Sequence, residues 1–253
     1  MKIGAQLYTV RDFTQNLDDF AESLKKIAGI GYTTVQVSGT CSFEADWLKE
    51  QLKNTGLTCA ITHTNQRRVA EETEAVINEH RIFGCGCIGL GSIPWELHNN
   101  PAGLQAFIEM YTEPARKIRE ADMKLMYHNH AFEFTKANGL TFLERLAAAF
   151  PAEELGFTLD SYWVQYGGGD PAAWAEKLSG RIDCVHVKDM KYENDRQMMA
   201  YIGEGCLNFD RYLSACESAG TRYVLVEQDD CQGRDPFWCL KKSYEYLTAM
   251  GLE

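Results

Sequence analysis

The sequence lacks any apolar run that approaches about 18 residues, the length typical of a transmembrane helix. It also lacks an apolar segment after Met1 to Gly4, so we expect no secretory signal and interpret this stretch as a strand. Basic side chains are the minority, because 25 Lys and Arg stand against 36 Asp and Glu, and the net charge is −11. This balance disfavours both a nucleic-acid partner and binding to an anionic membrane surface.

Two nucleotide-binding signals are also missing. Neither GxGxxG nor GxxxxGK follows the first predicted strand, which leads into Thr9 to Asp12.

The nine cysteines are odd in number, and Cys85-Gly86-Cys87 has no second pair at a zinc spacing. We therefore expect free thiols and a cytoplasmic protein. Gly167 to Asp170 is interpreted as a loop that leads into a helix cap rather than as a phosphate-binding nest.

The organising pattern is an alternation of short β-branched runs with longer segments of helical period. The predicted strands are 2–8, 33–38, 58–62, 86–91, 124–128, 156–160, 182–187 and 223–227. The predicted helices are 17–29, 44–54, 70–83, 103–121, 141–149, 171–178, 208–219 and 236–250, with Pro101 and Pro171 near helix starts. No linker divides the chain, so we predict a single domain over 1–253 folded as an α/β (β/α)8 TIM barrel. A doubly wound open sheet is the alternative.

Polar side chains gather where four consecutive predicted strands end. They are His128, Asn129 and His130 at the fifth strand, Asp160 at the sixth, His186 at the seventh and Glu227 at the eighth. In a barrel these ends converge on one face, and a carboxylate there is costly unless it is paired or bound to a cation. Carboxylates and imidazoles without thiolates suit Mn²⁺, Mg²⁺, Zn²⁺, Co²⁺ or Fe²⁺. The sequence therefore predicts one divalent metal ion at this face.

Other polar and aromatic positions carry weaker signals. Gln6, His63, Trp163 and Lys188 are predicted to line the pocket and contact substrate, and a salt bridge from Lys188 to Asp229 or Asp189 is the alternative for that lysine. His80 and His98 are expected on the surface. Trp95, Trp174 and Trp238 are expected to be core residues or loop anchors rather than platforms for a sugar.

Motifs along nearly the whole chain resemble the sugar phosphate isomerase/epimerase superfamily, the xylose isomerase-like TIM barrels. They are GAQLYTVRD at 4–12, YHNHAFEF at 127–134, LDSYWVQYGGGDP at 159–171, VHVKD at 185–189, IGEG at 202–205 and VEQDD at 226–230. The resemblance implies a divalent metal, most often Mn²⁺, held by Glu, Asp, His and Glu from strands five to eight. Asp160, His186 and Glu227 match the last three of these ligands.

The fifth strand departs from the family pattern. It ends in His128 and Asn129, so we expect Glu133 to reach back as the fourth ligand, with His128 as the alternative. Trp163 also stands where many relatives carry a histidine that helps bind substrate. This second departure weakens the expectation of a plain ketose 3-epimerase.

The predicted activity is a metal-dependent sugar isomerase or epimerase on a small carbohydrate or polyol. A base removes the proton beside a polarised carbonyl and an enediolate forms. Glu133 and Glu227 are the candidate bases, with His128 and His130 as alternatives. A lyase or dehydratase acting on a keto-inositol or a 3-keto-glycoside remains an alternative, as does a non-catalytic sugar-binding barrel. An enzyme like endonuclease IV is disfavoured by the negative charge, and a homo-oligomer is left open.

Overall fold

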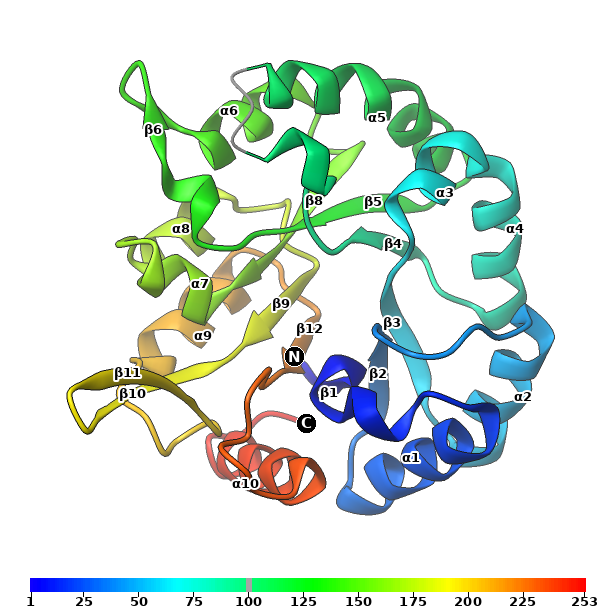
Figure 1. Cartoon of the computed structure of the whole chain (residues 1–253), viewed down its shortest axis with the longest axis vertical. Coiled ribbons are helices and arrows are strands. Elements are labelled where there is room, and N and C mark those ends of the chain that lie inside the picture. The colour runs from blue at the N-terminus through cyan, green and yellow to red at the C-terminus, as the bar shows by residue number, and fades with distance from the viewer. Residues whose placement is uncertain (99–101) are drawn as a thin grey trace.

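A computed structural model describes residues 1–98 and 102–253 of the chain. Parallel strands close into a barrel in the order β1-β12-β9-β8-β5-β4-β3-β2, and helices surround it (Figure 1). The strands are β1 (Lys2–Gln6), β2 (Thr34–Val37), β3 (Thr58–His63), β4 (Cys87–Leu90), β5 (Lys124–His128), β8 (Leu155–Asp160), β9 (Cys184–Val187) and β12 (Tyr223–Val226). The predicted TIM barrel is confirmed, so all eight strand ends share one face.

The outer layer is helical. Its α-helices are α1 (Leu17–Ile30), α2 (Ala45–Thr55), α3 (Gln66–Glu71), α4 (Thr73–Phe83), α5 (Gly103–Glu120), α6 (Phe142–Ala149), α7 (Ser161–Tyr166), α8 (Pro171–Lys177), α9 (Phe209–Ser218) and α10 (Pro236–Ala249). Short 3-10 helices are η1 (Leu7–Phe13), η2 (Trp95–Leu97) and η3 (Phe132–Phe134). Within the described residues, no helix has the length and apolar character needed to cross a membrane.

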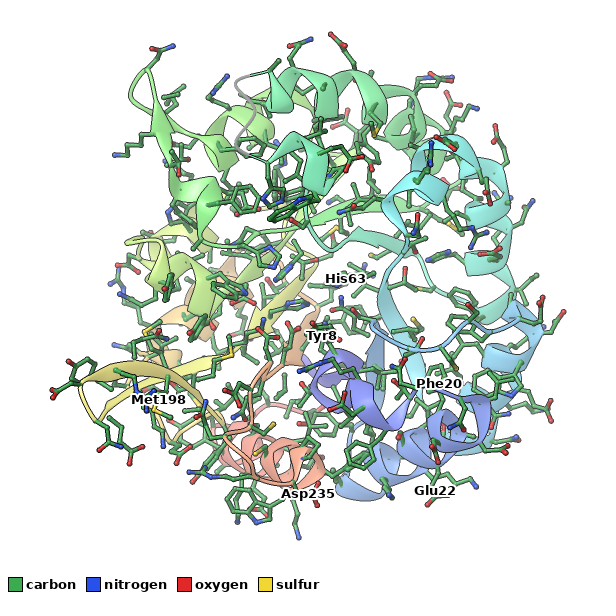
Figure 2. All side chains as sticks on the ribbon, in the orientation of Figure 1. Tyr8, Phe20, Glu22, His63, Met198 and Asp235 are labelled. Atoms are coloured by element: carbon green, nitrogen blue, oxygen red, sulfur yellow. The ribbon has the colours of Figure 1, made fainter. Side chains whose placement is uncertain are left out.

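Local sequence signals explain where these helices begin and end. The Asn16 side chain accepts a hydrogen bond from the Asp19 N–H at 2.9 Å and caps α1, and Gly31 follows its last turn. Phe20 of α1 is buried against the barrel, whereas Glu22 points outward (Figure 2). Asp170 caps α8 and Pro171 is its first residue, as expected, whereas Pro101 lies outside the described residues.

The apolar core has two parts. The larger part lies between strands and helices, and a smaller group fills the barrel interior: Ala60, Ile61, Cys87, Met126, Cys184 and Leu225. Close packing at this inner layer explains a glycine, because a Cβ on Gly89 would lie 2.1 Å from the Thr62 carbonyl oxygen. The nine cysteines are free, as expected. The interior is thus a packed core, and the buried polar side chains of Asp160 and His186 lie toward the carboxyl ends of its strands.

Two predicted elements differ from the structure, and one hairpin was not predicted. The helix predicted over 70–83 is broken at Glu72, which has φ −126° and ψ 35°, into α3 and α4. The first strand ends at Gln6 rather than at residue 8, because η1 begins at Leu7. A hairpin of β10 (Asp189–Glu193) and β11 (Arg196–Ala200) projects from the strand-end face, with Met198 on it (Figures 1 and 2).

The hairpin and one other inserted element follow strands of the barrel. Asn194 and Asp195 form the hairpin turn with φ of 52° and 56°, which suits a type I′ turn. A second small hairpin joins β6 (Lys136–Ala137) and β7 (Leu140–Thr141) ahead of α6. Short two-residue and five-residue strands of this kind carry too little periodicity to be read from sequence.

Candidate active site

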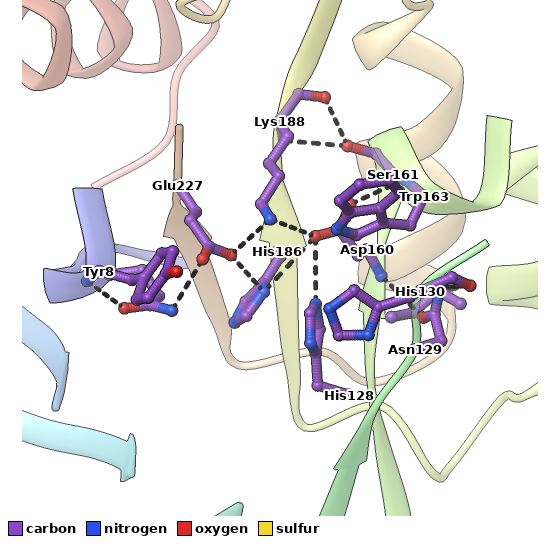
Figure 3. Close-up of polar contacts among 12 residues, drawn as sticks. Tyr8, His128, Asn129, His130, Asp160, Ser161, Trp163, His186, Lys188 and Glu227 are labelled. Atoms are coloured by element: carbon purple, nitrogen blue, oxygen red, sulfur yellow. Dashed lines mark hydrogen bonds and ion pairs between the residues drawn. The ribbon is translucent and has the colours of Figure 1, made fainter. Parts of the chain in front are cut away.

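Four buried side chains from adjacent strands meet at the carboxyl end of the barrel. They are His128 of β5, Asp160 of β8, His186 of β9 and Glu227 just after β12, and we call them the ligand cluster. The strand register brings them together, since Asp160 pairs with His186 and Leu225 also pairs with His186. One potential ligand atom from each residue lies within 4.8 Å of the other three (Figure 3).

The spacing of these atoms fits a single cation. His186 Nδ1 lies 2.8 Å from Glu227 Oε2, and Asp160 Oδ2 lies 3.2 Å from His128 Nε2 and 3.6 Å from His186 Nδ1. For a metal–ligand distance of about 2.1 Å, octahedral geometry places neighbouring ligand atoms about 3.0 Å apart and opposite ones about 4.2 Å apart. Among the described residues His186 Nδ1 and Glu227 Oε2 make no hydrogen bond of good geometry, although they lie in ion-pair contact with each other and Lys188 Nζ lies 2.9 Å from Glu227 Oε2. The donor set therefore fits a divalent metal ion.

Outer contacts orient both imidazoles toward the cluster. His128 Nδ1 lies 3.0 Å from the Gly91 carbonyl oxygen, and His186 Nε2 lies 2.6 Å from Gln36 Oε1. Oxygen acceptors at these positions require the ring nitrogens to donate, so the other nitrogen of each ring is free to act as a ligand. The Asn129 side chain adds a further link by accepting a hydrogen bond from the Asp160 N–H at 3.1 Å.

Lys188 places a positive charge beside the carboxylate oxygens of the ligand cluster. Its buried Nζ lies 3.2 Å from Asp160 Oδ2, 2.9 Å from Glu227 Oε2 and 3.0 Å from Asp229 Oδ2. Burial opposes the charge of the ammonium, but the three carboxylates outweigh burial and raise the Lys188 pKa well above its usual value. The salt bridge to Asp229 that we gave as the alternative is present, together with two contacts to the ligand cluster.

The electrostatic surroundings give the carboxyl groups of the site different pKa values. Burial alone would raise the pKa values of Asp160 and Glu227, but the charge of Lys188 and the nearby imidazoles hold both well below the usual range. Asp229 differs, because burial and the charge of Glu227 raise its pKa to about 7. Asp160 and Glu227 are thus ionised at neutral pH and attract a cation, whereas Asp229 is poised to gain or lose a proton.

The histidines around the cluster are held neutral, with one exception. Burial lowers the pKa of His63, His128 and His130, and for His130 the value falls to about 3. In His186 burial acts in the same direction, but the charges of Glu227 and Asp160 outweigh it and raise the pKa. A neutral imidazole is the form that binds a metal or accepts a proton.

Glu133 lies apart from the ligand cluster. Its carboxylate accepts hydrogen bonds from Tyr127 Oη and from the His130 N–H, both at 2.8 Å. Burial raises its pKa to about 8. The short η3 turn explains this placement, because it directs Glu133 inward to Tyr127. The fifth barrel strand therefore contributes His128 to the cluster, the residue that we gave as the alternative ligand.

The predicted substrate contacts line a cavity of about 330 Å³ above the cluster, which we call the central cavity. Its lining residues are Gln6, Tyr8, Ser38, His63, Gly91, His128, His130, Trp163, Lys188, Glu227 and Asp229. Gln6 Nε2 donates to Glu227 Oε1 at 2.9 Å, and His63 Nδ1 lies 3.1 Å from Ser38 Oγ. The structure thus brings Gln6, His63, Trp163 and Lys188 to one cavity, and Tyr8 and His63 point toward it (Figure 2).

Sequence reasoning missed two residues of the site and misplaced one histidine outside it. Gln36 and Ser38 were not singled out, although they interrupt the apolar run TTVQVS at alternate positions, which is the available signal. His80 was expected on the surface, and this was wrong. It is buried, with Nε2 2.8 Å from Thr62 Oγ1 and Nδ1 2.7 Å from the Val76 carbonyl oxygen. These bonds make it a satisfied core histidine.

Comparison with known proteins finds related barrels. A family model described as xylose isomerase-like TIM barrel matches residues 24–238. The chain is also similar to inosose dehydratase of Geobacillus kaustophilus (strain HTA426), with 22% identity over 266 residues that cover 90% of this chain and 86% of the relative. The match to the family model spans most of the barrel and all four residues of the ligand cluster.

Solved structures resemble the whole chain in fold. A sugar phosphate isomerase/epimerase from Parabacteroides distasonis ATCC 8503 has a TM-score of 0.80 and 22% identity, covering 98% of this chain and 93% of that one. An L-ribulose 3-epimerase has a TM-score of 0.75 and 13% identity, covering 98% and 94%. At these identities the likeness establishes the fold alone.

Proposed function

The chain belongs to the family of xylose isomerase-like TIM barrels, and on that premise we propose that it is a divalent-metal-dependent sugar isomerase or epimerase. The observation that carries the proposal is the convergence of four buried ligand atoms, within 4.8 Å of one another, beneath the central cavity. A charged site of this kind at the strand ends of a barrel is where catalytic groups gather. A small carbohydrate or polyol is the proposed substrate.

The ligand cluster is the proposed metal site. His128, Asp160, His186 and Glu227 would hold the ion, with His128 in place of the more usual carboxylate. We propose Mn²⁺ as the ion, because two oxygen and two nitrogen ligands without a thiolate suit it. Mg²⁺, Zn²⁺, Co²⁺ or Fe²⁺ would bind the same set of ligands. When bound, a divalent ion polarises a sugar carbonyl and the neighbouring hydroxyl, which acidifies the C–H bond between them.

Glu227 is the proposed base. Its carboxylate is ionised because Lys188 and His186 hold its pKa well below the usual value despite burial. Gln6 binds Oε1 and fixes the orientation of the carboxylate at the cavity wall. The adjacent Lys188 ammonium would stabilise the negative charge that develops on the substrate oxygen.

His130 is the proposed partner of Glu227. It follows β5, and Glu227 follows β12, so β8 and β9 separate them in the barrel, and Figure 3 draws them on opposite sides of Asp160 and Lys188. His130 Nδ1 is buried and has no hydrogen-bond partner among the described residues. Inversion of a carbon centre needs a base that removes the proton on one side of the substrate and a protonated group that returns a proton on the other side. Glu133, bound to Tyr127, would act by positioning the His130 loop.

A dehydratase or lyase is the second candidate, favoured by the similarity to inosose dehydratase over 90% of this chain. The first step would be the same proton removal by Glu227. The reactions differ afterwards, because elimination expels a hydroxyl or alkoxyl group beside the carbanion and needs a donor near the leaving oxygen. A keto-inositol or a 3-keto-glycoside would be the substrate.

Incubation of metal-loaded protein in D₂O with ketoses, keto-inositols and 3-keto-glycosides separates these reactions. Deuterium beside the carbonyl, with an inverted centre or a moved carbonyl, supports the isomerase or epimerase. Release of water or of an aglycone without either change supports the lyase. His186→Ala and treatment with EDTA serve as controls that remove the metal. Absence of exchange with every compound would favour a non-catalytic sugar-binding barrel.

A further inference from the structure

A row of aromatic rings leads out of the central cavity over the loops that follow β4 and β5. We call Trp95, His98, Phe132 and Trp163 the aromatic shelf. These residues line a second, more apolar hollow, and His130 and Trp163 line both this hollow and the central cavity. The shelf is therefore continuous with the site that we assign to the reacting sugar.

The rings of Trp95, His98 and Phe132 are in contact, and His130 joins them to Trp163. Ring centroids lie 5.2 Å apart for Trp95 and His98, and 4.3 Å apart for His98 and Phe132. His130 continues the row, because its ring is nearly parallel to that of Phe132 and lies 5.4 Å from that of Trp163. Rings in mutual contact form a firm surface whose faces can hold another ring at little entropic cost.

Trp95 departs most from expectation. We expected a core residue or loop anchor, but 81% of this side chain is exposed. Contiguous exposed apolar surface rimmed by polar groups is typical of ligand-binding and partner-binding sites, and Trp95 belongs to such a surface together with Phe132 and Trp163. The ring contact with His98 holds the indole in place while its other face stays open to solvent.

Two polar atoms at the boundary of the two hollows are unpartnered. Trp163 Nε1 and His130 Nδ1 are buried and have no hydrogen-bond partner among the described residues. The indole N–H of Trp163 can only donate, and a buried donor without an acceptor costs free energy, so a ligand that crosses this boundary is expected to supply an oxygen to it. The oxygen that joins two rings of a glycoside would lie at such a boundary.

The charges of the site disfavour a phosphorylated substrate. Among the described residues that line either hollow, Lys188 is the one Lys or Arg, and its Nζ already contacts Asp160, Glu227 and Asp229. TIM barrels frequently bind phosphate at the loops after strands seven and eight. Here the loop after β12 carries Asp229, which pairs with Lys188, and the exposed Asp230, and neither side chain offers a positive charge to a phosphate.

We propose that the substrate is an unphosphorylated keto sugar that carries a second ring, either glycosyl or aryl, in O-glycosidic linkage. The keto sugar lies in the central cavity over the ligand cluster, and this part rests on the proposed function. The second ring lies on the aromatic shelf, with its apolar face against Trp95 and Phe132. The linking oxygen accepts a hydrogen bond from Trp163 Nε1.

The test measures binding, without turnover, by isothermal titration of the metal-loaded protein. The probes are methyl β-D-glucopyranoside, phenyl β-D-glucopyranoside and cellobiose. We expect a two-ring probe to bind about tenfold more tightly than the methyl glucoside, as a stacked ring contact allows. Tighter binding of cellobiose identifies a glycosyl second ring, and tighter binding of the phenyl glucoside identifies an aryl one.

Matched variants locate the second ring. Trp95→Ala should remove most of the two-ring advantage and leave the methyl glucoside unchanged, whereas Trp238→Ala on α10, also an exposed indole, should change nothing. Equal binding of all three probes by the unmodified protein, or equal behaviour of the two variants, would overturn the proposal. So would a tenfold gain in affinity for fructose 6-phosphate over fructose.

The proposed reaction and the proposed role of the aromatic shelf can be refuted independently of each other. If the shelf binds a second ring but no D₂O exchange occurs with any keto sugar, the assignment of the shelf stands and the proposed reaction does not. If exchange occurs but two-ring probes gain nothing, the reaction stands and the shelf proposal is rejected.

Discussion

His128 Nε2 faces Asp160 Oδ2 at a distance of 3.2 Å, while Nδ1 of the same ring is directed at the Gly91 carbonyl oxygen. The Gly91 contact fixes the proton on Nδ1, so in the neutral ring a lone pair points at a carboxylate. Burial keeps the ring neutral by lowering its pKa. Two acceptors at this distance repel unless a cation lies between or beside them, and a metal ion bound to both relieves the repulsion.

Lys188 supplies part of this positive charge when no metal is bound. We predict that Lys188→Met lowers the free energy of unfolding of the metal-free protein by about 3 kcal/mol, because two buried carboxylates lose their partner. Mn²⁺ should then raise the melting temperature of the variant more than that of the unmodified protein. Differential scanning calorimetry with EDTA and with Mn²⁺ measures both effects.

Lys191→Met is the matched control for that variant. Lys191 lies on the β10 hairpin and pairs with Glu193 and Glu204 near the surface, so its loss should cost about 1 kcal/mol or less. The melting temperature of this control should respond to Mn²⁺ as the unmodified protein does. Equal responses of both variants to Mn²⁺ would argue against a shared site for Lys188 and the ion.

Gly205 has no room for a side chain. A Cβ there would lie 2.3 Å from Asp189 Oδ1 and 2.4 Å from the Met190 carbonyl oxygen. Asp189 binds the N–H groups of Gly203, Gly205 and Leu207, and so anchors the loop beyond the hairpin. We predict that Gly205→Ala lowers the free energy of unfolding by about 2 kcal/mol in urea titrations.

Gly29→Ala is a control substitution that should change stability in the opposite direction. This exposed glycine lies in α1 with nothing within 4 Å of an added Cβ, so alanine should stabilise the protein by up to about 1 kcal/mol. Destabilisation by both substitutions, or by neither, would refute the packing account of the Asp189 loop.

Glu133 should make stability depend on pH. Burial raises its pKa from 4.5 to about 8, so the folded protein retains a proton that the unfolded chain releases above about pH 4.5. The contribution of Glu133 to stability is therefore present at low pH and is lost as the pH rises toward 8. Glu133→Gln has no such proton, and its free energy of unfolding relative to the unmodified protein should increase between pH 5 and 8.

The expected size of that increase is at least about 2 kcal/mol, since one pKa unit corresponds to about 1.4 kcal/mol. Urea unfolding at both pH values, with EDTA present, measures it. Glu153→Gln, which alters an exposed carboxyl, should show no such increase. A pH-independent difference for Glu133→Gln would mean that this carboxyl ionises normally in the folded protein.

The barrel and most of the site could be predicted from strand-end residues. Asp160, His186 and Glu227 lie at the ends of apolar runs, and parallel strands bring such ends together, so their convergence follows from sequence order. The position of Glu133 could not be predicted in this way. It depends on a three-residue turn and on a hydrogen bond to Tyr127, neither of which has a periodic signal. His80 was misjudged for a different reason: it lies on the buried face of α4 with Val76, Ile77 and Phe83, where its ring nitrogens bond Thr62 and Val76, but a histidine was expected to face solvent.

Elemental analysis of protein purified without added metal tests the central claim most directly. The account predicts one divalent ion per chain in the unmodified protein and its loss in His128→Ala, Asp160→Ala and His186→Ala. Glu133→Gln should retain the ion, because that carboxyl is bound to Tyr127 and His130 instead. Full occupancy in the His128, Asp160 and His186 variants, or loss of the ion in Glu133→Gln alone, would contradict the assignment of the ligand cluster.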